Sequence, residues 1–210
     1  NIYMNNIFKN HFYVNLEKRA DRNKHAYNEL SKLDIIPNRL NAIEHPIGII
    51  GCALSHIKVI NEAKKYNWDY VCVFEDDIVI KNVNLLKRKV NKLIDTDFDV
   101  LMLSGNNFRP FEEKDEYNGD YIKVSKCFTT GAMIIKKHYY DTWLNNLKEG
   151  VEILMRTGDR NYSLDMYNHR LQQKDNWFLV TPICAYQKPD YSDIENNNVN
   201  YMNLLLNYDK

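Results

Sequence analysis

The order of apolar patterns along the chain constrains its fold more than any other feature. Short runs rich in β-branched and aromatic residues alternate with stretches whose apolar residues recur at helical spacing. In the first half we expect strands over residues 12–14, 38–43, 70–74 and 98–103, separated by helices over residues 26–33, 49–63 and 83–93. A series of this kind folds as a right-handed, mostly parallel sheet with helices on both faces. The expected fold class is therefore α/β.

The second half of the chain is less regular. We expect strands over residues 132–135 and 177–185, helices over residues 139–154 and 163–171, and a polar, Asn-rich tail. Residues 104–120 predict a loop long enough to be suspected of function. Its aromatic side chains, Phe108, Phe111 and Tyr117, belong either to a lid or binding platform or to an ordinary surface loop. No repeat or Gly/Ser-rich linker divides the sequence, so we expect one domain.

Charge and cysteine content narrow the class of protein. Lys and Arg (28) balance Asp and Glu (28), which disfavours binding to nucleic acid or to an anionic membrane surface. The four cysteines lack the spacing of a zinc site, and we expect them to be reduced. The longest apolar run, residues 47–54, is too short to span a membrane, and no secretory leader is visible. These observations predict a soluble domain.

Three consecutive acids end the buried strand predicted over residues 70–74. Glu75, Asp76 and Asp77 repel one another, so they must remain solvated or bind a cation. Open α/β sheets bind their ligands at the carboxyl ends of their strands, which is where this triplet lies. Mn²⁺ or Mg²⁺, held by one or two carboxylates and by phosphate oxygens, would offset the repulsion. The alternative is a charged exit from the strand with no ligand.

Other phosphate-binding and nucleophilic motifs are missing from the sequence. There is no GxxxxGK[ST] motif, and no GxGxxG follows the first predicted strand. Arg19 and Arg22 follow that strand and could hold a nucleotide, or they could form an exposed charged cluster at a helix start. No GxSxG occurs, and Ser55 and His56 are helical neighbours that point to different faces. We therefore expect His56 to be a packed or capping residue.

Several short blocks, taken together and in order, resemble glycosyltransferase family 25. This family includes bacterial lipooligosaccharide galactosyltransferases and procollagen galactosyltransferases, with viral members among the latter. The similarity extends from about Phe12 to Glu195. Its blocks are Phe12-Tyr13-Val14-Asn15-Leu16 with Arg19, Asp21 and Arg22; Arg39 and Ala42; Gly51-Cys52-Ala53-Leu54-Ser55-His56; Val73-Phe74-Glu75-Asp76-Asp77; Thr129-Thr130-Gly131-Ala132; and Pro182 through Gln187 to Ser192-Asp193.

The resemblance implies a GT-A-like fold, a UDP-sugar donor, a requirement for Mn²⁺ (or Mg²⁺), and inversion at the anomeric carbon. Carried over to this chain, it makes Glu75-Asp76-Asp77 a variant of the DxD motif. Asp77 would coordinate the metal, with Gln187 as a second contact near it. Asp165 would act as the catalytic base, unless it is simply an acid at a helix N-terminus. The nucleotide and donor sugar would be bound by Asn15, Arg19, Arg22, Arg39, Glu75 and Asp76.

The same resemblance sets expectations for organisation and partners. Residues 11–103 would be the nucleotide-binding half, residues 104–195 the acceptor-side half, and residues 196–210 a polar tail. The expected reaction transfers a hexose, galactose ahead of glucose, to a glycan or to hydroxylysine of a collagen-like protein. Two alternatives remain: a metal-dependent phosphohydrolase acting on a nucleotide-sugar, and an inactive carbohydrate-binding relative. The expected location is intracellular, either cytoplasmic or virion-associated, unless the domain is excised from a longer protein.

Overall fold

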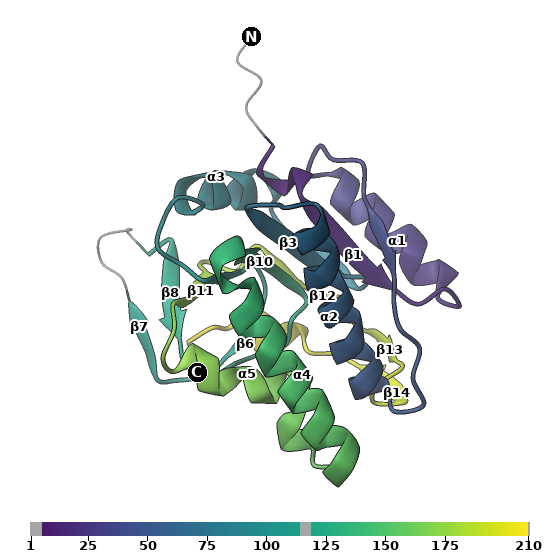
Figure 1. Cartoon of the computed structure of the whole chain (residues 1–210). Coiled ribbons are helices and arrows are strands. Elements are labelled where there is room, and N and C mark those ends of the chain that lie inside the picture. The colour runs from purple at the N-terminus through teal and green to yellow at the C-terminus, as the bar shows by residue number, and fades with distance from the viewer. Residues whose placement is uncertain (1–5, 114–118, 210) are drawn as a thin grey trace.

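A mixed eight-stranded sheet forms the centre of the protein (Figure 1). The computed structural model describes residues 6–113 and 119–209. In sheet order, the strands are β2 (Arg39–Asn41), β1 (His11–Asn15), β3 (Tyr70–Glu75), β10 (Ala132–Lys136), β5 (Val100–Met102), β11 (Trp177–Val180), β8 (Tyr121–Val124) and β7 (Phe111–Glu113). Three small two-stranded sheets join β4 (Ile78–Ile80) to β12 (Ala185–Gln187), β13 (Asp190–Ser192) to β14 (Asn197–Val199), and β6 (Asn106–Asn107) to β9 (Cys127–Phe128).

Most strands of the central sheet run in one direction, as the alternating pattern predicts. β1 is parallel to both β2 and β3, and β5 is parallel to β11. Two strands run the other way: β8, which is antiparallel to β11, and β10, which is antiparallel to β3 and β5 and separates them. β10 begins at the carboxyl end of β3, where Glu75 N–H donates a 2.8 Å hydrogen bond to the Gly131 carbonyl. Because it enters the sheet from that edge, it must run backwards.

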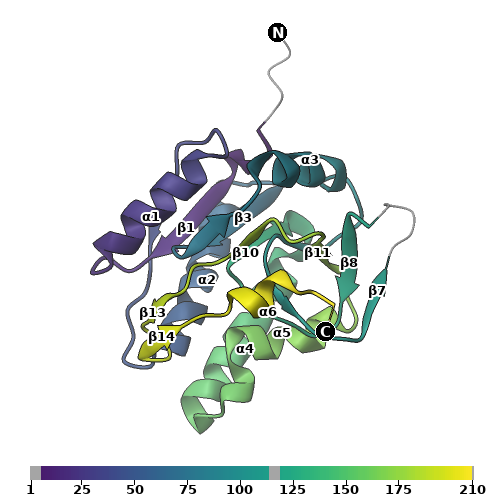
Figure 2. The same ribbon diagram turned by 180° about the vertical axis from the view of Figure 1, so that it is seen from behind.

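Helices cover both faces of the sheet, which confirms the expected α/β class. Figure 1 shows α2 and α4 side by side on one face, and Figure 2 shows α1 and α3 on the other. The helices are α1 (Ala20–Ser31), α2 (Gly48–Lys65), α3 (Val83–Leu93), α4 (Tyr140–Thr157), α5 (Leu164–Gln172) and α6 (Met202–Leu206). Short 3-10 turns occupy Ile7–Lys9, Lys137–Tyr139 and Arg160–Tyr162.

Alternation along each central strand divides the core into two layers. In β3, Val71 and Val73 pack with apolar residues of α2 and α4, whereas Cys72 and Phe74 pack with those of α1 and α3. Side chains of successive residues in a strand point to opposite faces, so a strand buried on both faces must be apolar throughout. Burying each large apolar side chain contributes about 1.5–3 kcal/mol, and these layers hold the carboxyl ends of the strands in register.

The block Gly51-Cys52-Ala53-Leu54-Ser55-His56 lies in α2, which packs closely against the segment after β2. A Cβ on Gly51 would lie 2.6 Å from the Ile43 carbonyl oxygen, so only glycine fits there. Ser55 Oγ donates to the Gly51 carbonyl at 2.7 Å and accepts the Ile43 N–H at 2.8 Å. Ser55 is thus a structural residue, and the helix N-terminus is held beside the sheet edge where the acids lie.

The segment between β5 and β8 contains more structure than the sequence indicates. It includes β6 and β7, and its described aromatic residues are packed: Phe108 lies edge-on to Phe128, and Phe111 lies edge-on to Tyr208. Tyr117 falls outside the described residues. All four cysteines are free, as expected. Within residues 6–113 and 119–209, no helix has the length and apolar character needed to cross a membrane.

Candidate active site

Four elements bring the predicted site residues to one edge of the sheet. Glu75 is the last residue of β3, and Asp76 and Asp77 form the turn into β4. Asn15 ends the neighbouring parallel strand β1, so it lies beside this turn. Gln187 reaches the same place because it pairs with Ile78 across the β12–β4 ladder. The expectation that the acids lie at the carboxyl edge is correct.

Asp76 is fixed by two donors from the first βα unit. Asn15 Nδ2 donates to Asp76 Oδ2 at 2.7 Å, and Arg22 Nη1 donates to Asp76 Oδ1 at 3.0 Å. Arg39 Nε in turn donates to Asn15 Oδ1 at 2.8 Å, which holds the amide in position. Burial raises the pKa of Asp76, and the positive charge of Arg22 opposes that rise. Asp76 is therefore a tightly held carboxylate.

Glu75 is held from the opposite side. Thr130 Oγ1 donates to Glu75 Oε1 at 2.6 Å, and Gln187 Nε2 donates to Glu75 Oε2 at 3.1 Å. His56 Nε2 lies 3.8 Å from Glu75 Oε1, while its Nδ1 is 3.0 Å from the Cys52 carbonyl oxygen. Burial lowers the pKa of His56 and raises that of Glu75, whose pKa is raised further by the charges of Asp76 and Asp165.

Asp77 is the least satisfied of the three acids. Arg22 Nη1 donates to its Oδ2 at 3.2 Å, whereas its Oδ1 is buried and has no hydrogen-bond partner. Burial and the neighbouring charge of Glu75 raise the pKa of Asp77 to about 7, although Arg22 and the nearby Gln187 side chain act in the opposite direction. A buried carboxylate oxygen without a donor is unfavourable unless a ligand compensates it.

All three acids line one cavity of about 1020 Å³. Its other walls come from the start of α2, the Thr129-Thr130 segment, the start of α5, and the β13–β14 region. Arg22 and Gln187 also line it, but Asn15, Arg19 and Arg39 do not. Arg19 is engaged by Asp21 and Asp193 at 2.9 and 2.6 Å. Asn15 bonds Asp76, Arg19 bonds Asp193 and Arg39 bonds Asn15, so these side chains support the cavity wall, and their direct contact with a nucleotide stays a prediction.

Asp165 lines the same cavity from the first turn of α5. Its Oδ1 accepts hydrogen bonds from Ser163 Oγ at 3.0 Å and from Met166 N–H at 2.9 Å. Its Oδ2 forms no hydrogen bond or ion pair with any other part of the described chain. The structure thus brings Asp165 together with the acidic triplet in one cavity, with one carboxylate oxygen available.

The donor set fits a hard divalent cation bound jointly with a phosphate ligand. Among the described residues, no group of three His, Cys, Asp or Glu side chains forms a ready-made metal site. The unpartnered Asp77 Oδ1 is nevertheless a hard oxygen ligand. Gln187 lines the same cavity and donates through Nε2 to Glu75, so its Oε1 would be the atom to serve as a second oxygen ligand. Mg²⁺ and Mn²⁺ take one or two protein oxygens and complete their shells with phosphate and water.

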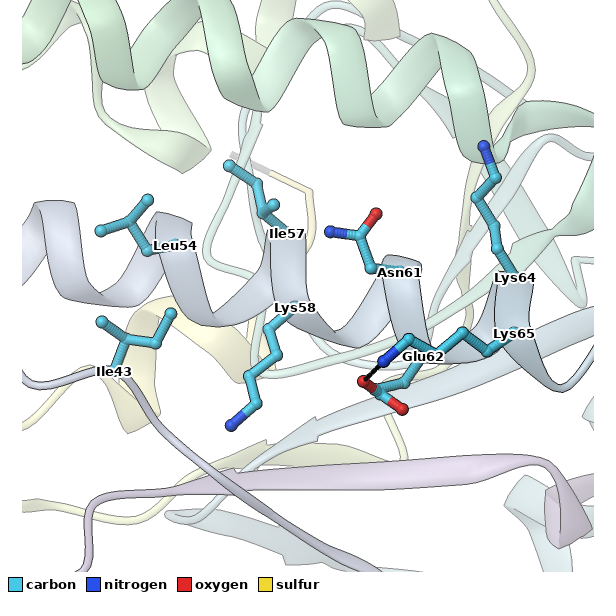
Figure 3. Close-up of a pocket in the computed structure, with 8 residues that line it drawn as sticks. All are labelled: Ile43, Leu54, Ile57, Lys58, Asn61, Glu62, Lys64 and Lys65. Carbon is cyan, nitrogen blue, oxygen red and sulfur yellow. Dashed lines mark hydrogen bonds and ion pairs between the residues drawn. The ribbon is translucent and has the colours of Figure 1, made fainter.

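A second hollow, of about 730 Å³, lies on the outer face of α2 (Figure 3). Leu54, Ile57 and Lys58 line it together with Ile43, and Lys65 pairs with Glu62 at its end. None of the three acids and neither Asp165 nor Gln187 lines it. This hollow lacks the carboxylate cluster, so we place the candidate active site in the larger cavity.

Sequence reasoning missed several residues that shape the site. Thr130 and His56 lie in recognised blocks, yet nothing in their local pattern predicts that both face Glu75. Asp190 lies 3.5 Å from Arg22 and 3.6 Å from Arg19, so it completes the network around the two arginines. These contacts join parts of the chain far apart in sequence. The contact of Thr130 with Glu75 follows from the pairing of β10 with β3, and the contact of Gln187 with Glu75 follows from the pairing of β12 with β4. Neither pairing can be read from local sequence patterns.

Comparison with known proteins identifies the family. A family model described as glycosyltransferase family 25 (LPS biosynthesis protein) matches residues 46–152, which is more than half of the chain. The matched region includes α2, the acidic triplet and the Thr129-Thr130 segment. The chain therefore belongs to glycosyltransferase family 25, and it is a sugar-transferring enzyme. None of the curated proteins compared with it matches the sequence.

Solved structures with similar folds include two viral proteins. A197 from STIV is 15% identical, with a TM-score of 0.48, and the alignment covers 95% of this chain and 94% of that one. A glycosyltransferase involved in glycosylation of the major capsid of PBCV-1 is 10% identical, with a TM-score of 0.46 and coverages of 81% and 92%. A Drosophila β1,4-galactosyltransferase 7 mutant in complex with manganese, UDP-Gal and xylobiose is 13% identical, with a TM-score of 0.39 and coverages of 81% and 75%.

Proposed function

We propose that the protein transfers a hexose from a UDP-hexose to a hydroxyl acceptor on a glycan or on a hydroxylysine-bearing protein, with inversion at the anomeric carbon and with bound Mn²⁺ or Mg²⁺. Galactose is the preferred hexose and glucose the next. One observation carries the proposal: Asp77, whose Oδ1 is buried and unpartnered, lines a large cavity together with Gln187 at the carboxyl end of β3. An oxygen in this position is suited to a cation that is itself bound to a diphosphate.

The acidic triplet, Arg22 and Gln187 each have a proposed task in donor binding. Asp77 and Gln187 would hold the metal ion, which when bound neutralises the negative charge that develops on the departing UDP. Arg22, bonded to both Asp76 and Asp77, would offset the charge of the acids and face the diphosphate. Asp76 would contact the ribose or the donor sugar, and Glu75 would support the nucleotide side.

Asp165 is the proposed base. In an inverting transfer, the acceptor oxygen forms a bond to the anomeric carbon while the bond from that carbon to the UDP oxygen breaks. The acceptor hydroxyl must lose its proton as it attacks, and a carboxylate on its side of the sugar can take it. Asp165 Oδ2 has no partner among the described residues, so it is available for this proton.

A donor screen tests the proposal. UDP-galactose, UDP-glucose and UDP-N-acetylglucosamine would be incubated with and without Mn²⁺ and with an acceptor panel, and UDP release would be measured. We expect Mn²⁺-dependent release that increases with acceptor. Release of free sugar without acceptor dependence would favour a phosphohydrolase, and absence of Mn²⁺-dependent UDP binding would indicate an inactive relative. Asp77→Ala should abolish turnover while leaving the fold intact, and normal turnover of this variant would overturn the assignment.

A further inference from the structure

The wall of the cavity opposite the first βα unit is built from two short antiparallel segments. Asn106 of β6 lies opposite Phe128 of β9, and Thr129 follows directly. Thr130, the next residue, holds Glu75. Asn106, Phe128 and Thr129 all line the cavity that contains the acidic triplet and Asp165. These three residues therefore lie next to one another in the lining of the cavity that holds the proposed reaction centre.

Two polar atoms on this surface are left without partners. Asn106 Oδ1 and Thr129 Oγ1 are both buried, and neither has a hydrogen-bond partner. Buried side-chain polar atoms in folded proteins are nearly always bonded, so each exception calls for an explanation. Of the nine such atoms among the described residues, these two belong to neighbouring residues in one part of the cavity lining. A ligand that offers hydroxyl groups to both atoms would satisfy them together.

The backbone at Thr129 is strained. Its φ is +70°, a left-handed conformation that β-branched residues rarely adopt. Strain of this kind persists where the surrounding structure enforces it, and it is concentrated at ligand sites. Glycine would adopt this conformation at no steric cost, yet the chain carries a threonine that lines the cavity and whose hydroxyl is buried without a partner. The strain is thus associated with a specific polar group.

We propose that Asn106 and Thr129 bind hydroxyl groups of the hexose that is transferred, with the Phe128 ring against the apolar face of the sugar. The inference rests on the proposed function. The chemistry of the surface selects the ligand: an amide and a hydroxyl can exchange hydrogen bonds with a neutral polyol, and an aromatic ring complements the C–H face of a pyranose. The diphosphate, by contrast, would lie toward Arg22 and Asp77, where the charged groups are.

Calorimetry with two ligands isolates this subsite. UDP and UDP-galactose (or UDP-glucose, if the donor screen selects it) would be titrated in Mn²⁺ into the wild type, Asn106→Ala and Thr129→Val. Thr129→Val is β-branched like threonine, so it keeps the shape and the backbone preference while removing the hydroxyl. Thr129→Ser restores the hydroxyl. Asn107→Ala is the matched control, because Asn107 is buried next to the surface but does not line the cavity and donates to the Tyr208 carbonyl instead.

We expect Asn106→Ala and Thr129→Val to raise the Kd for the UDP-hexose about fivefold each and to leave the Kd for UDP within about twofold of wild type. Thr129→Ser and Asn107→Ala should keep wild-type affinity for both. Unchanged UDP-hexose affinity in both cavity variants would overturn the hexose subsite while leaving the proposed function intact. A raised acceptor KM with unchanged donor affinity would also overturn it, because the surface would then bind the acceptor. If the wild type binds no UDP, the proposed function fails and the subsite with it.

Discussion

Asn15 Nδ2 donates a 2.7 Å hydrogen bond to Asp76 Oδ2, and this bond ties the end of β1 to the turn that follows β3. Both side chains are almost fully buried. Asn15 accepts a bond from Arg39 and also donates to the Arg19 carbonyl at 3.1 Å, so it organises the whole base of the acidic turn. The carboxylates are therefore positioned by neighbouring parallel strands before any ligand binds.

Replacement of Asn15 should damage both stability and activity. Asn15→Ala removes one donor to the buried carboxylate of Asp76 and leaves Arg39 Nε without its acceptor, although Arg39 Nη2 keeps its bonds to the Asn15 carbonyl and to Asn41. A buried polar group that loses its partner costs about 1–3 kcal/mol, so we expect a loss of unfolding free energy in this range, measured by urea denaturation. Asn41→Ala is the control, because Asn41 accepts only an exposed bond from Arg39, and its cost should stay below about 0.5 kcal/mol. Equal losses in the two variants would contradict the role of Asn15.

The raised pKa of Asp77 predicts a trade-off between stability and metal binding. Its pKa is about 7 in the folded protein and near 3.8 in an unfolded chain. The protonated carboxyl is thus favoured by folding, and this contribution is fully present below about pH 4 and lost as the pH rises through 7. Removing the charge of Asp77 could therefore raise the free energy of unfolding at high pH by at most about 4 kcal/mol. For Asp77→Asn we expect about 1–2 kcal/mol, because Arg22 loses a charged partner in this variant.

Asp77→Asn should consequently be more stable than wild type at pH 8 in a buffer without divalent ions, and equally stable at pH 4. Thermal unfolding at a series of pH values measures the difference, since background titrations affect both proteins alike. Mn²⁺ together with UDP should raise the Tm of the wild type only. A wild type that remains the more stable protein at pH 8 without metal would show that Asp77 is not an uncompensated buried carboxylate.

The elements that position the acids are those that the sequence predicts best. The run Tyr70-Val71-Cys72-Val73-Phe74 is apolar at every position, which specifies a strand buried on both faces, and its charged end specifies a sheet edge. The helix now seen as α3 has the predicted bounds, Val83–Leu93. These features depend on local patterns of apolar and charged residues, so a single sequence carries them.

Contacts between distant segments could not be predicted in the same way. The apolar pattern of residues 132–135 predicts the strand β10 but not its direction. The sequence therefore does not predict that Thr130 contacts Glu75. The strands β4, β6, β9 and β12 have only two or three residues each, which is too short for an alternating apolar pattern to be recognised. Gln187 was inferred from the family resemblance alone, and its place beside Glu75 depends on the register of β12 against β4.

Gly131 controls the space around Gln187. A Cβ at this position would lie 3.1 Å from Gln187 Cγ and 3.1 Å from Ser104 Oγ, so in Gly131→Ala both side chains must give way slightly. We expect the Gln187 side chain to shift away from Glu75 and the Mn²⁺-dependent affinity for UDP to fall about tenfold, measured by calorimetry. Gly158→Ala is the control, since a Cβ there meets nothing within 4 Å and any cost would come from its positive φ. Full UDP affinity in Gly131→Ala would argue against Gln187 as a metal contact.

Asp165 can be tested against an acid in a similar helical position. Asp165 and Asp141 both lie in the first turn of a helix, but Asp141 is exposed, pairs with Lys64 and does not line the cavity. Both substitutions to Asn remove a charge that favours the helix N-terminus, a loss of about 0.3–1 kcal/mol in each case. Only Asp165→Asn should lower kcat, by about 10²- to 10⁴-fold, with Mn²⁺-dependent UDP affinity unchanged. A kcat within threefold of wild type would remove Asp165 as the base and leave it as a helix-stabilising acid, the alternative that the sequence leaves open.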